Sequence, residues 1–298
     1  MINIILIALV ALSFTIGTTS FYPNRKHSNL FVKNPLVRVA VVDTGFGPWR
    51  DNVIPMCDDG HGMMVGDKFV ETSYPEHDGL PGGHGTHVSG AIHQAVTNNI
   101  MSISPGLTVE DMRDSINAFK QVTDTRYCQV ILRVWDDTAP DKISMQYYKA
   151  LEFIANNNDR LKIDVINISL SGEDFLTRES NTIKKLLDNN VIIVASAGND
   201  NVNLDNQPRY PSMIDDRIIA VGFMEYVRQD GMVIYTRGPS SNYGSAVDLW
   251  EPGEILSAHP NNYKEGDVSI KKGTSQAAGI VSGKIVRKLI EKRSQDEH

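Results

Sequence analysis

Four runs of β-branched and aliphatic residues constrain the fold of this chain most strongly. They lie at residues 37–42, 129–134, 164–170 and 191–195. Short, nearly continuous apolar runs are typical of strands in a parallel sheet that is buried on both faces. Segments with helical periodicity separate the runs, so the sequence predicts an α/β fold with a mainly parallel central sheet and helices on both faces.

The helices are predicted from apolar spacing and from helix-start signals. Thr108 and Asp111 are spaced as a capping box, ahead of a helix whose apolar face carries Val109, Met112, Ile116 and Phe119. Further helices are predicted from His84 onward, over 142–157, over 177–189 and from Ser275 onward. Residues 46–83 are interpreted as a long surface loop, and residues 200–272 as a less regular region with a short apolar run at 217–222.

The 298 residues are enough for one large domain, which we expect over 36–298. Residues 1–20 carry no charge and combine an apolar run with small residues at the end, which predicts a secretory signal peptide cleaved near residue 20. The run is too short to span a bilayer comfortably. Residues 21–35 are expected to form an extended arm, and the mature protein to be exported without stable membrane insertion.

The charge balance argues against a nucleic-acid partner. The chain has 36 acidic and 29 basic residues, and its formal net charge is -7. Its two cysteines, Cys57 and Cys128, are too few for a disulfide framework. One bridge and two buried free thiols both remain open.

Three residues at element boundaries supply the roles of nucleophilic acyl transfer. Asp43 ends a predicted strand, while His84 and Ser275 each begin a predicted helix. Taken singly, these residues are ordinary turn and cap formers. Together they offer a hydroxyl nucleophile, an imidazole base and a carboxylate that orients the imidazole. The amide of Asn199 could bind the oxyanion, and the unpaired N–H groups at the start of the Ser275 helix would stabilise the same charge.

Seven short stretches extend this pattern along the chain. They are VVDTG at 41–45, HGTHVSG at 84–90, NISL at 167–170, ASAGN at 195–199, YP at 210–211, VDLWEPG at 247–253 and GTS at 273–275. In this order, from about residue 36 to 290, they resemble the subtilisin-like serine proteases, the subtilase family.

The resemblance implies a three-layer subtilisin-like fold and a serine endopeptidase acting on polypeptides through an acyl-enzyme. It implies a triad of Asp43, His84 and Ser275, with Asn199 and the Ser275 backbone N–H as oxyanion donors. It also implies that the substrate backbone adds as a strand to an edge at Ser169, Leu170 and Ser171, with Gly198 nearby. Arg209 would line the pocket for the side chain before the cleaved bond. We hypothesise that it favours an acidic or polar residue there; a solvent-facing arginine is the alternative.

The chain departs from the family pattern at several positions. Gln276 stands in place of the usual Met, Gly279-Ile280 in place of Pro-His, and Glu251 in place of Ala. Gly279 is expected to loosen its helix by roughly 1 kcal/mol relative to Ala. The short stretch between the predicted signal cleavage and the first core strand leaves no room for a folding prodomain. The expected alternatives are folding without one, slow folding, or a separate folding partner or inhibitor.

The resemblance requires no cofactor, although structural calcium is compatible with acidic loops at 58–59, 136–137 and 215–216. These loops are equally well interpreted as solvated turns, and no ligands are assigned. The histidines at 77, 84, 87 and 93 raise the alternative of a metal hydrolase. However, His84 and His87 are three apart without an intervening Glu, unlike the zinc-binding helix pattern. His87 is therefore interpreted as a structural histidine.

Two further alternatives concern the function as a whole. A catalytically impaired binding protein on a protease fold is kept as an alternative, because the changes at Gln276 and Gly279 lie directly behind the nucleophile. Nucleotide binding is set aside, since the glycines at 45–47 and 79–85 complete no phosphate-loop pattern.

Overall fold

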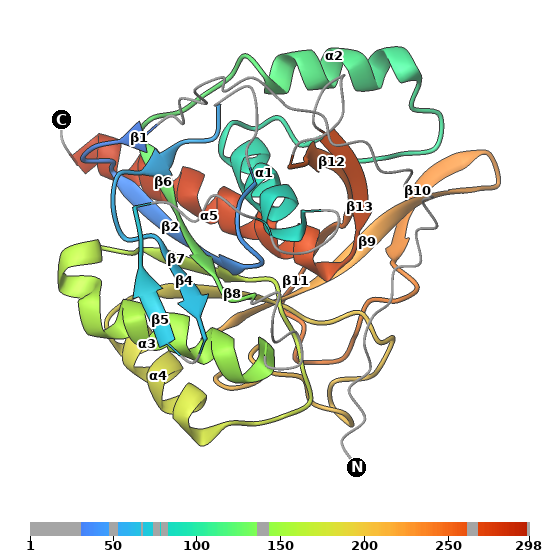
Figure 1. The fold of residues 1–298 in the computed structure, drawn as a ribbon. Helices are drawn as coiled ribbons and strands as arrows, with labels where there is room; N and C mark the ends of the chain where they lie inside the picture. The colour runs from blue at the N-terminus through green and yellow to red at the C-terminus, as the bar shows by residue number, and fades with distance from the viewer. Residues whose placement is uncertain are drawn as a thin grey trace, which may run out of the picture.

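A mostly parallel sheet runs through the middle of the molecule (Figure 1). The computed structural model describes residues 31–47, 53–66, 68–73, 78, 83–135, 143–260 and 268–296. Along the sheet the strand order is β1-β3-β6-β2-β7-β8-β9-β10, and β2 in its centre pairs in parallel with β6 and β7. Those strands are β1 (Phe31–Val32), β2 (Val37–Asp43), β3 (Met56–Cys57), β6 (Tyr127–Arg133), β7 (Val165–Ile168), β8 (Ile192–Ser196), β9 (Ile219–Gln229) and β10 (Met232–Arg237).

Helices cover both faces of this sheet (Figure 1). On one face lie α1 (His84–Val96) and α5 (Thr274–Asp296), with α2 (Val109–Phe119) beyond them. The other face is covered by α3 (Ile143–Leu161) and α4 (Thr177–Asp188). A hydrophobic core lies on each face of the sheet, and alternate residues of β2 point into the two cores. Val39 and Val41 pack with α1 and α5, while Ala40 and Val42 pack with α3 and α4. The predicted three-layer α/β fold is confirmed.

The four apolar runs form β2, β6, β7 and β8, and the predicted helices are present. Around α2 the capping box is complete: the Asp111 N–H donates to Thr108 Oγ1 at 3.1 Å, and the Thr108 N–H donates to Asp111 Oδ2 at 2.9 Å. The predicted signal peptide and residues 21–30 of the predicted arm lie outside the described residues. The end of that arm, Phe31–Val32, pairs with β3. No helix within the described part of the chain is long and apolar enough to cross a membrane.

Two regions interpreted as irregular contain strands, and here the interpretation was wrong. Residues 46–83 include β3, β4 (Gly62–Val65) and β5 (Lys68–Glu71). Residues 200–272 include β9, β10, β11 (Leu249–Pro252), β12 (Glu254–Ala258) and β13 (Val268–Lys272). The run at 217–222 overlaps the start of β9. The other strands are short or partly exposed and carry no continuous apolar run. The hairpin between β9 and β10 did have a sequence signal, the Asp230-Gly231 dipeptide at its tip. Both residues have positive φ, as tight hairpin turns require.

Cys57 and Cys128 form a disulfide, which resolves the alternatives that the sequence left open. Cys57 ends β3 and Cys128 lies in the neighbouring strand β6, with their Cα atoms 4.9 Å apart. Both cysteines are fully buried. The bridge therefore ties two strands of the sheet inside the core that faces α3 and α4.

Glycines in α5 allow a close approach of α1. A Cβ added at Gly283 would lie 2.3 Å from the carbonyl oxygen of Ile92, and one added at Gly279 would lie 3.1 Å from the Ala91 Cβ. The helix runs unbroken through both positions. Gly279 is thus explained by helix packing, which a larger side chain would disturb.

We predict that Gly283→Ala destabilises the fold. Alanine is the better helix former by about 1 kcal/mol, but overpacking against a backbone oxygen typically costs about 1–3 kcal/mol. The cost of overpacking should therefore exceed the gain in helix propensity. The measurement is the thermal unfolding midpoint. Gly172→Ala is the matched control, because no atom lies within 4 Å of a Cβ added there. An unchanged or raised midpoint for Gly283→Ala would contradict the packing argument.

Candidate active site

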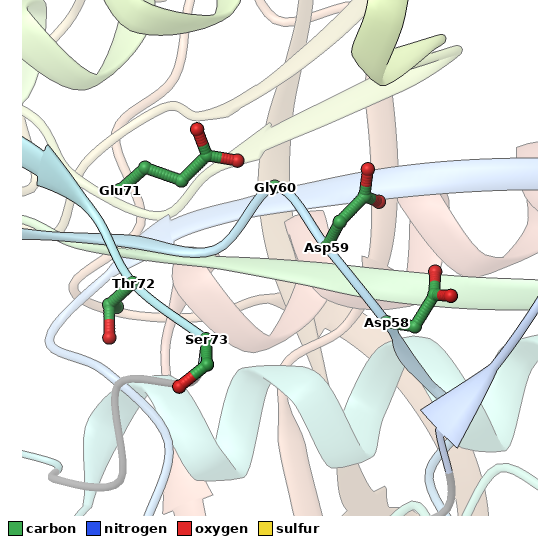
Figure 2. Close-up of a pocket in the computed structure, with 6 residues that line it drawn as sticks. All are labelled: Asp58, Asp59, Gly60, Glu71, Thr72 and Ser73. Atoms are coloured by element: carbon green, nitrogen blue, oxygen red, sulfur yellow. The ribbon is translucent and has the colours of Figure 1, made fainter.

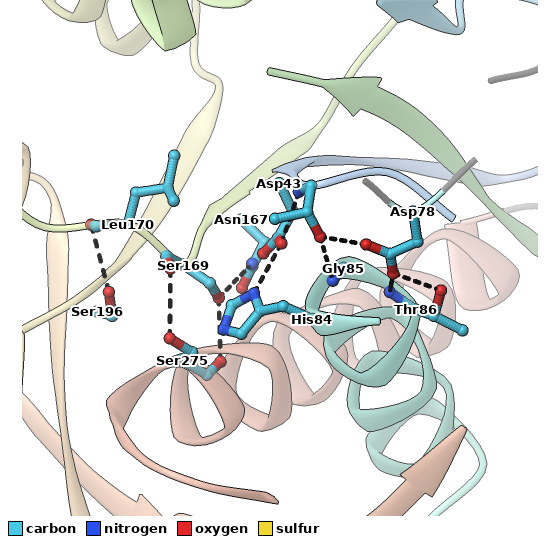
Figure 3. Close-up of polar contacts among 11 residues, drawn as sticks. Asp43, Asp78, His84, Gly85, Thr86, Asn167, Ser169, Leu170, Ser196 and Ser275 are labelled. Atoms are coloured by element: carbon cyan, nitrogen blue, oxygen red, sulfur yellow. Dashed lines mark hydrogen bonds and ion pairs between the residues drawn. The ribbon is translucent and has the colours of Figure 1, made fainter. Parts of the chain in front are cut away.

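Asp43 and His84 meet at the carboxyl end of β2. Asp43 is the last residue of the strand and is only 1% exposed. Its Oδ1 accepts hydrogen bonds from the Thr44 backbone N–H and from His84 Nδ1, each at 2.7 Å (Figure 3). With Nδ1 donating to the carboxylate, the neutral imidazole has Nε2 left as its proton acceptor. The pair therefore presents a base with a fixed tautomer.

The local backbone explains why His84 can reach Asp43. His84 is the first residue of α1, and Gly83 before it takes a left-handed conformation with φ 58°. Gly85 after it lies against the chain that follows β2, where an added Cβ would be 2.2 Å from the Gly45 carbonyl oxygen. Glycines on both sides thus let the start of α1 lie against the end of β2.

Nearby charges set the protonation of His84. Burial alone would lower its pKa, but the charge and hydrogen bond of Asp43, together with the charge of Asp78, raise the pKa above its ordinary value. Lys271 opposes this effect. The carboxylates therefore favour the imidazolium form, which is the form that a general base reaches after taking a proton.

Ser275 lies in the first turn of α5 and is 7% exposed. Its hydroxyl donates to the Ser169 carbonyl oxygen at 3.2 Å, and the Ser169 hydroxyl donates back to the Ser275 carbonyl oxygen at 3.0 Å. In Figure 3 the His84 ring lies between Asp43 and the turn of α5 that carries Ser275. Hydrogen bonds thus join His84 to Asp43 and Ser275 to Ser169, and the Ser275 hydroxyl is turned to Ser169 in this structure.

Asn199 follows β8 and is anchored beside the start of α5. Its Oδ1 accepts hydrogen bonds from the Thr274 backbone N–H at 3.0 Å and from the Thr274 hydroxyl at 3.1 Å. Since the carbonyl end of the amide is held in this way, the NH₂ end is the one left to donate elsewhere. The amide lies next to the residue that precedes Ser275.

The residues predicted to hold substrate follow β7 and β8. Leu170 accepts a hydrogen bond from the Ser196 hydroxyl at 3.3 Å (Figure 3), and Ser171 is exposed. Gly198 has φ 98°, and a Cβ added there would lie 2.9 Å from the Ser171 hydroxyl. The two segments therefore lie against each other, with Ser169 touching Ser275 at one end.

Arg209 is buried and bound to two carboxylates. It is 6% exposed, and its guanidinium pairs with Asp200 at 2.9 Å and with Glu173 at 3.0 Å. It is therefore not the solvent-facing arginine of the alternative. Because its charge already has two partners, however, the hypothesis that it attracts an acidic substrate side chain loses its basis.

The described histidines do not form a metal site. His87 Nε2 bonds to the Ser269 carbonyl oxygen at 2.9 Å, and burial lowers the pKa of His87 well below its ordinary value. His93 donates to the Val122 carbonyl and accepts from the Tyr127 hydroxyl, and burial lowers its pKa to about 4. Across the described ranges no three His, Cys, Asp or Glu side chains are grouped around a metal position. His77 lies outside those ranges.

Two of the acidic loops considered for calcium have arginine partners instead. Asp58, Asp59 and Glu71 line an open hollow of about 370 Å³ together with Gly60, Thr72 and Ser73 (Figure 2). Asp59 pairs with Arg38, Glu71 with Arg160, and Asp215 elsewhere with Arg217. The loop at 136–137 lies outside the described residues. The hollow contains none of the predicted catalytic residues.

Several polar residues that hold the site together were not predicted from the sequence. Thr274 anchors Asn199, while Thr44, Asp78 and Thr86 form a hydrogen-bonded group beside His84. The threonines stand inside the recognised motifs, so their positions were visible although their contacts were not. Asp78, six residues before His84 in a glycine-rich stretch, could not be distinguished from a turn-forming aspartate.

Comparison with known proteins identifies the family. The model of the subtilase family matches residues 36–294. The "Major intracellular serine protease" of Bacillus subtilis (strain 168) is 29% identical over 266 residues, which are 85% of this chain and 68% of that protein. Subtilisin DY of Bacillus licheniformis is 24% identical over 254 residues, covering 84% of this chain and 76% of the relative.

Solved structures show the same fold. A cold-adapted subtilisin-like serine proteinase superposes with a TM-score of 0.56 at 23% identity, over 92% of this chain and 82% of the other. Fervidolysin from Fervidobacterium pennivorans, a keratinolytic enzyme related to subtilisin, gives a TM-score of 0.61 at 19% identity, over 88% of this chain and 37% of the other. Because the family model matches residues 36–294, the chain belongs to the subtilase family and is a serine-type endopeptidase.

Proposed function

We propose that this protein hydrolyses peptide bonds with Ser275 as nucleophile, His84 as general base and Asp43 as the group that orients the base. The observation that carries the proposal is the 2.7 Å hydrogen bond from His84 Nδ1 to the buried Asp43 carboxylate. It leaves Nε2 to accept a proton on the side of the ring where Figure 3 draws Ser275. Serine needs such a partner because its hydroxyl is a weak nucleophile at its own pKa.

The reaction proceeds in two stages through an acyl-enzyme. The Ser275 hydroxyl turns from the Ser169 carbonyl to His84, gives up its proton and attacks the substrate carbonyl carbon. The imidazolium is stabilised by Asp43 and then returns the proton to the departing amine. Water repeats the sequence on the ester, and the hydroxyl of Ser275 is restored.

In this proposal two hydrogen-bond donors stabilise the negative charge that develops on the substrate carbonyl oxygen. They are the Asn199 amide, whose other end is fixed by Thr274, and the backbone N–H of Ser275 at the start of α5. The substrate backbone adds along Ser169, Leu170 and Ser171 with Gly198 opposite, as extended peptides add to a sheet edge. Arg209, paired with Asp200 and Glu173, lies at the far end of these two segments.

We also propose that the protein is exported. The Cys57–Cys128 disulfide supports this, because structural disulfides persist mainly in oxidising compartments. The predicted signal peptide at 1–20, a separate folding partner and structural calcium remain predictions. The similarity to a protease named as intracellular is the observation against export.

The deciding experiment is active-site labelling of residues 21–298 with a fluorophosphonate probe. We expect the protein to be labelled and Ser275→Ala to be unlabelled, with proteolysis reduced on the order of 10⁶-fold, a magnitude established on a subtilisin from the same family. Failure of the folded protein to react would favour the alternative of an impaired binding protein. In that case Ser275→Ala should leave binding unchanged.

Activity should be lost as the pH falls through the raised pKa of His84. The base works only when neutral, so a pKa above the ordinary value moves the acidic side of the kcat/KM profile to higher pH. Asp43→Asn should shift that side to lower pH and reduce kcat on the order of 10⁴-fold, because the tautomer is no longer fixed. Asp111→Asn, an exposed carboxylate in α2, is the control and should leave the profile in place.

Asn199→Ala tests the oxyanion donor. Removing one such donor from a subtilisin lowers kcat on the order of 100- to 1000-fold, and we expect a loss in that range with little change in KM. Thr274→Val is the companion variant, since it removes one of the two donors that hold the Asn199 carbonyl. It should lower kcat less than Asn199→Ala does. Equal kcat for Asn199→Ala and the parent enzyme would remove Asn199 from the mechanism.

A further inference from the structure

Asp78 is a second carboxylate beside the Asp43–His84 pair, and the mechanism above does not use it. It is partly buried and pairs in an isolated antiparallel bridge with Gly45, two residues after Asp43. Its Oδ1 accepts from the Thr44 hydroxyl at 2.5 Å, and its Oδ2 accepts from the Thr86 backbone N–H at 2.9 Å and the Thr86 hydroxyl at 2.7 Å (Figure 3). No arginine or lysine pairs with it within the described part of the chain. Its partners are all hydrogen-bond donors from the two elements that carry the catalytic pair.

The carboxylate sets the direction of both hydroxyls. An ionised carboxylate can only accept hydrogen bonds, so each threonine hydroxyl must donate its single proton to Asp78. Each hydroxyl oxygen is then left to accept from a backbone amide. The Thr44 oxygen accepts from the Gly85 N–H at 2.8 Å, and the Thr86 oxygen accepts from the Gly47 N–H at 2.8 Å.

These two bridges run in opposite directions between the same elements. Thr44 directly follows Asp43 and reaches the residue directly after His84. Thr86, in the first turn of α1, reaches back to the chain that follows β2. The end of β2 and the start of α1 are thus joined by two hydroxyl bridges, both oriented by one carboxylate.

We propose that Asp78 is a positioning residue for the Asp43–His84 pair, acting through the hydroxyls of Thr44 and Thr86. This inference rests on the proposed function, since a positioned base is of use only to a nucleophile that it serves. A shift of about 1 Å in a reacting group can cost on the order of 100-fold in rate. Two bridges that fix the start of α1 against Asp43 prevent such a shift.

The charge of Asp78 also acts on His84. The titratable and charged groups that face the imidazole are Asp43 from β2, Asp78, Lys271 from β13 and His87 from α1. Both carboxylates raise the pKa of His84, and Lys271 lowers it. Burial and the charge of Asp43 raise the pKa of Asp78 above its ordinary value, and its three hydrogen bonds oppose this by favouring the ionised form. Removing the charge of Asp78 should therefore lower the pKa of His84, whereas removing an uncharged structural contact should not.

Asp78→Asn is the first test. Its remaining oxygen can still accept from the two Thr86 donors, so its NH₂ group faces the Thr44 oxygen, which already accepts from Gly85. We expect kcat to fall on the order of tenfold to 100-fold with KM little changed. The acidic side of the kcat/KM profile should shift to lower pH, because one negative charge near His84 is lost.

Thr44→Val and Thr44→Ser form a second test that leaves Asp78 in place. Valine keeps the shape but breaks the bridge to Gly85, so kcat should fall as in Asp78→Asn. Serine keeps the hydroxyl and should restore kcat to nearly the parent value. Because the charge of Asp78 is retained, neither variant should reproduce the shift to lower pH. This pair keeps the proposal testable if Asp78→Asn does not fold.

Asp111→Asn is the matched control, since Asp111 likewise accepts from a threonine hydroxyl and a backbone N–H, yet lies in α2. All rates are measured per fluorophosphonate-reactive site, with unfolding midpoints taken in parallel. A lower midpoint for Asp78→Asn with unchanged kcat and unchanged pH profile would overturn the proposal. Absence of labelling in the parent protein would instead overturn the proposed function, so the two failures are distinguishable.

Discussion

The close packing of α1 against α5 is the constraint on which the site depends. His84 begins one helix and Ser275 lies in the first turn of the other, so the distance between the helices sets the distance between the proposed base and the proposed nucleophile. Gly283 lies against the backbone of α1, and a single added Cβ there would be 2.3 Å from the Ile92 carbonyl oxygen. The departure of Gly279 from the family pattern belongs to the same contact. A Cβ added at Gly279 would lie 3.1 Å from the Ala91 Cβ, so a larger side chain there would require α1 to shift by a few tenths of an ångström.

Under the proposed function, the polar groups of the site are arranged around that contact so that each catalytic atom has one role left to perform. Asp43 and the Nδ1–H tautomer leave His84 Nε2 as an acceptor. Thr274 occupies the carbonyl of Asn199 and leaves its NH₂ group as a donor. Asp78 accepts the protons of the Thr44 and Thr86 hydroxyls, whose oxygens are then left as acceptors for backbone amides. Such preorganisation matters because groups that are already oriented need no reorganisation as charge develops in the transition state.

The sequence predicted the parts of the structure that follow from local pattern. The buried strands were found because β2, β6, β7 and β8 are continuous apolar runs, and α2 was found because Thr108 and Asp111 cap it. The strands in 46–83 and 200–272 were not predicted as strands. Only the start of β9 lies in an apolar run, and the exposed part of the β9–β10 hairpin is stabilised by strand pairing. The Asp43–His84 contact was expected from the roles of its residues. The group formed by Thr44, Asp78 and Thr86 was not, because hydrogen bonds between segments separated by up to 41 residues leave no periodic signal.

Ser169 connects substrate placement with the state of the nucleophile under the proposed function. Its carbonyl oxygen accepts the Ser275 hydroxyl in this structure, and it also lies on the edge to which the substrate backbone is proposed to add. A substrate N–H that pairs with this carbonyl competes with the Ser275 hydroxyl for the same acceptor. His84, whose pKa is raised by its carboxylate neighbours, is then the alternative acceptor for the hydroxyl proton. The reciprocal bond from the Ser169 hydroxyl to the Ser275 carbonyl holds the first turn of α5 in place while the side chain turns.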